Sequence, residues 1–430
     1  MTITPPIGTY LAGYDARTDP ARGVHDELDA RCLVLDDPSG AVVILAVDVL
    51  QLPTAFANAV RAAIAQTTGI PRERILACAT HTHSAPDLEG TYTPGGPDRS
   101  LTEMWRRALA GCAEAAWRGR VDADVEFGLG TVDGVGVNRR HPDGHPVDPL
   151  VGVVSARLRG GERACVLVNY TCHPVVLGPD NLCISADYPG FARRAIEAVE
   201  GPRTLAMFTN GAEGDVNTGH SADLSGIGAP IPGRTFARAR RLGHRLAGEV
   251  IKVLAGPMVG LSGPIAATAC EVFLPFRETP PPAAAEAALA AADREVGRLV
   301  ALGADPNAAT AAKIRRFHAA VHLGVARRRA AATAPGVTAE LQTVRVGDLA
   351  LVGIPGELFV ELGLAVKARS PFLHTLVLGL ANGSVGYLPT REACESGGYE
   401  AVATQFALGA GEMVQNACLE MLQSLKEGHV

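Results

Sequence analysis

Apolar runs of strand length alternate with helical segments along much of the chain. An apolar run at 41–47 is followed by a segment with helical spacing at 54–69 and by a second apolar run at 75–79. The same order of strand, helix and strand recurs within 163–210 and within 349–383. This repetition predicts an α/β fold, with a mixed β-sheet built from βα units and flanking helices.

One segment departs from this alternation. Residues 280–335 are rich in alanine and arginine, have strong helix propensity and carry proline at both borders. We interpret them as a helical insertion between strands near 266–274 and 337–346. Within it, His318 and His322 are four residues apart, but the glutamate of an HExxH motif is missing and arginines surround them. We therefore expect ordinary surface or packing histidines there.

The composition is that of an ordinary globular protein, with 47% hydrophobic and 20% charged residues. A net charge of -6 gives no basic footprint for nucleic acid. No apolar run reaches transmembrane length, and the N-terminus lacks the features of a signal peptide. The nine cysteines are scattered, form no CxxC pair and fall mostly in apolar segments, which favours reduced thiols and a cytoplasmic location. We expect a small-molecule substrate and no integral membrane segment, and a homo-oligomer stays open.

Polar residues follow the predicted strands at their carboxyl ends. In sheets built from βα units these ends lie on one edge, where ligands usually bind. The polar groups found there are His81, His83, His173, residues 210–217, Glu357 and residues 382–387. The sequence therefore predicts that these side chains converge on one site.

The pair His81 and His83 admits several interpretations. If the preceding strand continued through them, both imidazoles would point to the same face. Both could then bind a metal ion, or one could bind it while the other transfers protons. Alternatively, both are loop histidines that hydrogen-bond to backbone carbonyls. The segment HPDGHP at 141–146 looks like a turn, and we assign its histidines no chemistry.

A set of short motifs resembles one family in content and in order. The motifs are CATHTHSAPD, NYTCHP with ISADYPG, NGAEGDVN, GIPGELF and ANGSVGYLPTREACESGGYEA, together with GVHDELDARCLVLDD and VNRR…VDPLVGVV. Each is weak alone, but their combined order is similar to that of the neutral/alkaline non-lysosomal ceramidases. The resemblance covers nearly the whole chain and matches the family's zinc-dependent catalytic domain. We accordingly expect residues 1–430 to form a single catalytic domain that contains the insertion.

The resemblance implies roles for individual residues. The implied zinc ligands are His81, His173, Glu357 and Tyr387. His83 would lie beside the metal as an acid/base or substrate-orienting group, and Arg139 would face the polar group of the substrate.

Elementary chemistry is consistent with this set. Two neutral imidazoles and one carboxylate leave Zn²⁺ with a residual positive charge that acidifies bound water and polarises a carbonyl. We expect Glu357 to open a helix, where the dipole favours an anion. Tyr387 is a less usual ligand and could instead hydrogen-bond an oxyanion. Asp187 and Asp215 could hold the second N–H of a ligand histidine, or could simply cap a helix or turn.

Two departures from the family's pattern bear on the substrate. Members with ceramidase activity carry serine where this chain has Asn217, which can donate a hydrogen bond at the reacting carbonyl but cannot act as a nucleophile. The family's C-terminal β-domain has no counterpart after the last predicted helix. We therefore expect a soluble or mildly amphiphilic N-acyl compound or a related small amide, with Arg139 gripping an anionic oxygen bidentately.

The predicted activity is thus zinc-dependent amide hydrolysis by metal-activated water. The same site could instead act on an ester, lactone or glycosidic bond, since a fold resemblance does not fix the chemistry. A catalytically inactive binding protein is the non-enzymatic alternative, although all four ligand positions are filled.

Overall fold

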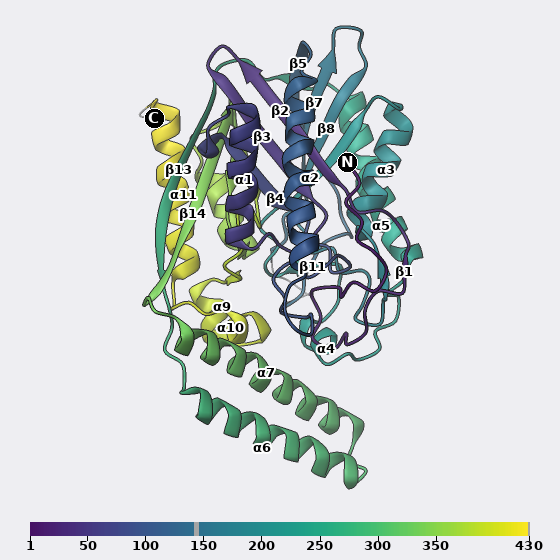
Figure 1. The fold of residues 1–430 in the computed structure, drawn as a ribbon, viewed down its shortest axis with the longest axis vertical. Helices are drawn as coiled ribbons and strands as arrows, with labels where there is room; N and C mark the ends of the chain where they lie inside the picture. Colours follow the sequence, from purple (N-terminus) through teal and green to yellow (C-terminus); the bar gives the residue numbers. More distant parts are fainter. Residues whose placement is uncertain (142–145, 429–430) are drawn as a thin grey trace.

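The computed structural model describes residues 1–141 and 146–428, so the turn predicted at 141–146 falls largely outside the described part. It confirms the α/β class, with mixed parallel and antiparallel sheets flanked by helices (Figure 1). Three sheets of three to five strands form its centre, and helices cover their outer faces.

The largest sheet has five strands, and its β8–β10 pair is parallel while the others are antiparallel. In spatial order the strands are β10 (Leu205–Asn210), β8 (Arg163–Tyr170), β7 (Leu150–Leu158), β5 (Ala123–Thr131) and β12 (Val259–Gly260). Helices α3 (Asp187–Glu200) and α5 (Phe236–Ala255) pack on each other and on this sheet. The sheet delivers the residues that follow β8 and β10 to the same edge.

A second sheet contains the first predicted strand–helix–strand unit. Its strands are β2 (Ala30–Asp37), β3 (Gly40–Val47) and β4 (Ile75–Ala79), and β3 and β4 are parallel. Helices α1 (Thr54–Thr68) and α2 (Arg99–Arg118) pack beside it. Along β3 the side chains alternate: Val43 and Leu45 belong to the core cluster under the helices, whereas Ile44 belongs to the cluster between the sheets.

The third sheet has four strands and carries the insertion. Its order is β13 (Ile265–Pro275), β14 (Gly336–Val346), β15 (Leu349–Gly353) and β17 (His374–Leu378). The β15–β17 pair is parallel, as expected for a βαβ unit, and its crossover is α8 (Val360–Arg369). The C-terminal helix α11 (Ala410–Glu427) packs against β13 and α8.

The remaining elements are short and lie in the connections. They are β1 (Gly23–Val24), η1 (Arg72–Arg74), β6 (Val137–Asn138), β9 (Cys183–Ile184), β11 (Val216–Asn217), α4 (Ala222–Gly226), β16 (Glu357–Leu358), β18 (Tyr387–Leu388), α9 (Arg391–Ser396) and α10 (Tyr399–Ala403). Several of these two-residue strands pair loops that follow different strands of one sheet: β6–β11 does so in the five-stranded sheet and β16–β18 in the four-stranded sheet.

The predicted helical insertion is present as two antiparallel helices between β13 and β14. These are α6 (Pro282–Ala301) and α7 (Pro306–Ala331), and each starts with proline, whose missing N–H costs nothing in the first turn. The Asp305 side chain accepts hydrogen bonds from two backbone N–H groups at the start of α7. The hairpin projects away from the sheets (Figure 1). Its α7 side packs against the body of the protein at α4 and α10.

Two further observations concern the whole described part. None of its helices combines the length and apolarity needed to cross a bilayer. All nine cysteines lie in it as free thiols, most of them buried.

Candidate metal centre and pocket

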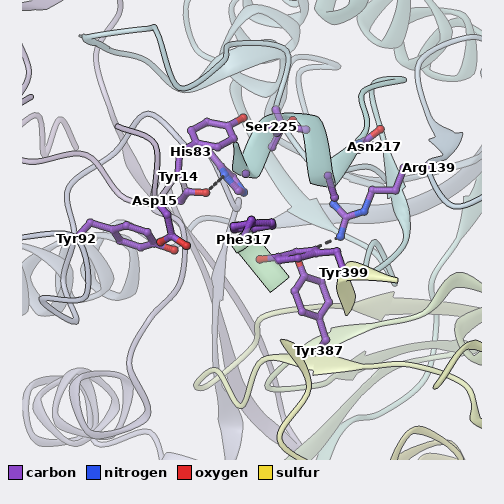
Figure 2. A pocket seen from close by; sticks show the side chains of 14 residues that line it. Tyr14, Asp15, His83, Tyr92, Arg139, Asn217, Ser225, Phe317, Tyr387 and Tyr399 are labelled. Carbon is purple, nitrogen blue, oxygen red and sulfur yellow. Dashed lines mark hydrogen bonds between the residues drawn. The ribbon is translucent and has the colours of Figure 1, made fainter. Parts of the chain in front are cut away.

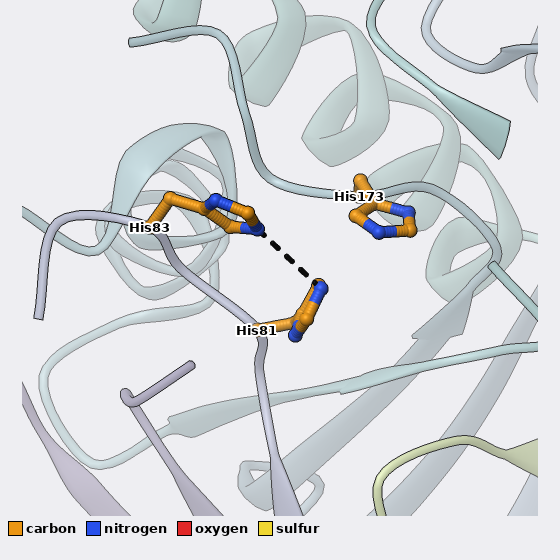
Figure 3. A group of neighbouring side chains, drawn as sticks. All are labelled: His81, His83 and His173. Carbon is orange, nitrogen blue, oxygen red and sulfur yellow. Dashed lines mark hydrogen bonds between the residues drawn. The ribbon is translucent and has the colours of Figure 1, made fainter. Parts of the chain in front are cut away.

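Three histidines from two strand-end loops meet in one place, as Figure 3 shows. His81 and His83 follow β4, His173 follows β8, and their ligand atoms all lie within 4.8 Å of one another. The Nε2 atoms of His81 and His83 are 3.4 Å apart. The predicted convergence is therefore observed, but the preceding strand does not continue through His81 and His83, as one interpretation of the pair assumed. The strand ends at Ala79, and His81 has a φ of 73°, so a turn and not a continuing strand brings the two rings together.

Backbone carbonyls fix the orientation of all three imidazoles. The Nδ1 atoms are hydrogen-bonded to Leu50 O at 2.7 Å for His81, to Glu213 O at 2.7 Å for His173 and to Gly13 O at 3.1 Å for His83. A carbonyl can only accept, so Nδ1 carries the proton in each ring. Each Nε2 is therefore left as a lone pair directed toward the centre of the cluster.

The carboxylate of Glu357 completes the cluster. Its Oε2 lies 3.1 Å from His173 Nε2 and 3.5 Å from His81 Nε2. Burial lowers the pKa of His173 to about 4, so its ring is neutral at neutral pH. Inward-facing lone pairs and one carboxylate are a donor set that suits Zn²⁺.

Glu357 does not open a helix, contrary to the sequence prediction. It lies in β16, and α8 begins three residues later at Val360, so the helix-dipole argument does not apply. Instead β16 pairs in parallel with β18, and Glu357 is the register partner of Tyr387. The Tyr387 hydroxyl accepts a hydrogen bond of 3.1 Å from Arg139, and burial followed by the Glu357 charge raises the pKa of the phenol.

The guanidinium of Arg139 donates hydrogen bonds to three protein groups. Its Nε donates to Glu400 at 2.7 Å, and its Nη2 donates to Gly214 O at 2.8 Å as well as to Tyr387. Only Nη1 has no hydrogen-bond acceptor among the described residues. The Nε and Nη2 groups of the fork therefore already serve protein acceptors, and the bidentate contact with an anionic substrate stays a prediction.

The side-chain amide of Asn217 forms hydrogen bonds within the turn at 217–220. Its Nδ2 donates to His220 O at 2.7 Å, and its Oδ1 accepts from the N–H groups of Gly219 and His220 at 2.9 and 3.1 Å. These bonds form the side-chain-closed turn typical of asparagine. The amide thus shapes the pocket wall, and donation to a reacting carbonyl stays a prediction.

Asp187 does not contact a ligand histidine. Ala186 occupies the N-cap position of α3, and Asp187 has a φ of 51°. Its carboxylate accepts hydrogen bonds from Leu177 N at 3.1 Å and Tyr188 N at 2.6 Å. Burial raises its pKa to about 7. The backbone carbonyls described above take the role that was predicted for this carboxylate.

Asp215 likewise makes no direct contact with the histidines. Its carboxylate accepts from Val360 N at 2.9 Å and from Asn138 Nδ2 at 2.8 Å, while its carbonyl accepts from Arg139 N at 2.8 Å. Burial raises its pKa to about 6. Asp215 thus ties the segment that carries Arg139 to the start of α8, next to Glu357.

A pocket of about 500 Å³, partly open to solvent, adjoins the cluster (Figure 2). Of the predicted site residues, His83, Arg139, Asn217 and Tyr387 line it. The other lining residues are Gly13, Tyr14, Asp15, Tyr92, Val175, Ala222, Ser225, Gly226, Phe317 and Tyr399. Five of these fourteen residues are Phe or Tyr, and only Val175 and Ala222 have aliphatic side chains.

Sequence reasoning missed several of these residues. Tyr399 and Glu213 lie inside the motifs GGYEA and NGAEGDVN, which gave a signal that was not used. Glu213 is fully buried, and neither carboxylate oxygen has a hydrogen-bond partner among the described residues. Burial and then the Glu357 charge raise its pKa. Phe317 gave no signal at all, because nothing in a helical insertion indicates contact with a distant pocket.

Comparison with known proteins points to one family. No known protein-family model matches the chain. The neutral ceramidase of Mycobacterium tuberculosis (strain ATCC 25618 / H37Rv) is 25% identical over 489 residues, covering 97% of this chain and 75% of that protein. The crystal structure of neutral ceramidase from Pseudomonas aeruginosa matches with a TM-score of 0.75 at 20% identity, covering 99% of this chain and 73% of that chain. A ceramidase complexed with C2 matches with a TM-score of 0.75 at 19% identity, over 99% and 74% of the two chains.

The chain has the fold of the neutral ceramidase structures, with a histidine cluster beside a pocket. The resemblance to the neutral ceramidase family, predicted from the ordered motifs, is confirmed by the sequence relative and by the shared fold.

Proposed function

We propose that the protein is a zinc-dependent hydrolase that cleaves the amide bond of an N-acyl compound or a related small amide. The observation that carries this proposal is the convergence of three imidazole Nε2 atoms and the Glu357 carboxylate next to a pocket. Zinc bound there would supply a Lewis acid for the substrate carbonyl and would acidify a water molecule near neutral pH.

Exposure to the pocket separates the histidines into two roles. His81 and His173 are almost fully buried behind the pocket wall, whereas His83 is half-buried and lines the pocket. We assign His81, His173 and Glu357 to the metal and His83 to proton transfer, from the attacking water to the leaving amine. His83 suits this work because burial and the neighbouring imidazoles hold its pKa below the usual value, so it is neutral and able to accept a proton.

Tyr387 and Arg139 are hydrogen-bonded to each other and line the pocket across from His83 (Figure 2). We call this pair the hydrogen-bonding edge. The Arg139 guanidinium polarises the Tyr387 hydroxyl, so the phenol can donate to an oxyanion that develops on the substrate carbonyl. Direct coordination of zinc by Tyr387 is the alternative role implied by the family resemblance. Glu400 and Gly214 hold Arg139 in place, which preorganises this edge.

The proposed substrate is a compact N-acyl compound and not long-chain ceramide in a membrane. The support comes from the pocket, whose walls are aromatic and polar and whose Asn217 is tied into a turn. Cytoplasmic action on a water-soluble substrate is part of the same proposal.

A substrate panel tests the proposal. The zinc-loaded protein is assayed with N-acyl amino acids, short-chain ceramide, long-chain ceramide in mixed micelles, and simple esters, lactones and glycosides. We expect the highest kcat/KM for a soluble N-acyl amide. A higher kcat/KM for an ester, lactone or glycoside would favour that bond type on the same metal centre, and turnover of none of them would favour a binding protein.

A further inference from the structure

The helical insertion supplies one wall of the pocket. Phe317, on α7, lies among the pocket-lining side chains (Figure 2), although α7 belongs to a hairpin that otherwise projects from the body. It is the only aromatic residue within 280–335. Its side chain is buried, with 7% of the residue exposed. The small hydrophobic core of the insertion consists of Ala285, Leu323 and Ala326 and does not include this ring. Its burial elsewhere indicates that Phe317 acts in contact with the body of the protein.

Two contacts hold Phe317 in this position. Its ring stacks on Tyr399 with a centroid distance of 5.5 Å and an interplanar angle of 16°. On another side it lies against Gly226, where a Cβ atom would come within 2.2 Å of the Phe317 ring. The ring therefore needs a residue without a side chain at 226, and it closes the space between α4 and α10.

A hydrogen bond next to Phe317 fixes the insertion in register. His318 Nε2 lies 2.6 Å from Asp223 Oδ1, and Asp223 belongs to α4, the same helix as Gly226. The insertion is thus attached at the pocket rim through two adjacent residues. This also gives His318 a packing role, in agreement with the sequence prediction.

We propose that Phe317 is a specificity-determining residue, which limits the length of the substrate group that the pocket accepts. The proposal rests on the proposed function, because it concerns the same pocket and the same metal centre. A chain that extends beyond the first few carbons meets the Phe317–Tyr399 stack. Short or flat acyl groups fit against these rings, and a longer alkyl chain is excluded.

Straight-chain alkyl hydroxamates from two to ten carbons test this without any turnover, since the hydroxamate anchors on zinc and the chain extends into the pocket. Dissociation constants are measured by calorimetry on zinc-loaded wild type and on Phe317→Ala, Phe317→Trp and Leu323→Ala. Leu323 is the matched control, because it is buried in the insertion's own core and does not line the pocket.

We expect the wild-type affinity to stop rising after a short chain. In Phe317→Ala it should continue to rise, by about three- to fourfold for each additional methylene buried. Phe317→Trp should stop earlier than wild type, and Leu323→Ala should keep the wild-type profile. Identical length profiles in wild type and both Phe317 variants would overturn the proposal while leaving the metal centre intact. Failure of every hydroxamate to bind would overturn the metal centre and this proposal with it.

Discussion

Glu357 and Tyr387 are direct register partners in the parallel pair β16–β18, although they lie far apart in the sequence. The pairing holds the carboxylate against His173 and the phenol against Arg139 in one backbone unit. A Cβ atom added at Gly356 would lie 2.9 Å from Gly386 O, so the two segments approach too closely for a side chain there. The geometry of the proposed metal centre therefore depends on a backbone contact beside it.

The variant Gly356→Ala tests this dependence without altering any proposed ligand. The added methyl group should push β16 from β18 and lower zinc affinity by about 10- to 100-fold, as loss of ligand-orienting contacts typically does. Zinc affinity is measured by competition with a chromogenic chelator. Gly297→Ala is the control, because a Cβ atom on that exposed helix meets nothing within 4 Å. Equal zinc affinity in the two variants would contradict the dependence.

Replacing the histidines singly separates metal binding from proton transfer. His83→Ala should keep near-normal zinc and lose turnover by about 10²- to 10⁴-fold, because it removes a general acid/base. His81→Ala should lose zinc by orders of magnitude in affinity. Metal content by elemental analysis is compared with kcat, and His322→Ala, on the insertion, serves as control. If His83→Ala loses zinc as completely as His81→Ala, then His83 is a ligand and the assignment is wrong.

A buried ion pair joins Asp48, directly after β3, to Arg193 on α3. We expect it to anchor the sheet whose strand β4 leads to His81. Asp48 and Arg193 are both buried, and their two hydrogen bonds are 2.8 and 2.5 Å long. Asp48→Asn removes the nearest counter-charge of the guanidinium and leaves only Asp29 at 3.9 Å, so the free energy of unfolding should fall by about 3–5 kcal/mol. Urea denaturation measures this. Asp19→Asn, which breaks an exposed pair with Arg22, should leave the unfolding midpoint nearly unchanged, and a similar midpoint for Asp48→Asn would refute the anchoring role.

His220 should give the protein a pH-dependent weakness outside the metal centre. Burial, followed by Arg234 and Arg238, lowers its pKa to about 3, and its Nε2 has no hydrogen-bond partner among the described residues. Below about pH 6.5 the unfolded chain binds a proton that the folded chain does not, so wild type loses stability as pH falls.

The measurement is the difference in unfolding free energy between wild type and His220→Gln, because other titrating groups then cancel. This difference should move in favour of the variant as pH falls from 7 to 4, with a slope approaching 1.4 kcal/mol per pH unit. A difference that stays constant over this range would show that His220 is not held neutral by the fold.

The sequence predicted much of the fold and of the metal cluster because both follow from local patterns. Strand ends in βα units share an edge, so His81, His173 and Glu357 could be placed together without coordinates. The backbone details could not be predicted. The left-handed turn at His81 and the parallel pairing of Glu357 depend on contacts between segments that are distant in the sequence.

The protein partners of the polar side chains could not be predicted either. Arg139 is occupied by Glu400, and Asn217 closes its own turn, and neither contact has a signature in the spacing of residues. Phe317 reaches the pocket across a contact with Tyr399 that no periodicity indicates. Competition between partners is a property of the packed structure, so composition and motif order leave it undetermined.

The central claim is that zinc at the His81–His173–Glu357 cluster is required for hydrolysis. The most direct test removes the metal with a chelator, dialyses the chelator away and titrates Zn²⁺ back while following cleavage of the best substrate from the panel. We predict that activity disappears on removal and returns linearly up to one equivalent of Zn²⁺ per chain, whereas His81→Ala shows no return. Full activity in the metal-free wild-type protein would contradict the account.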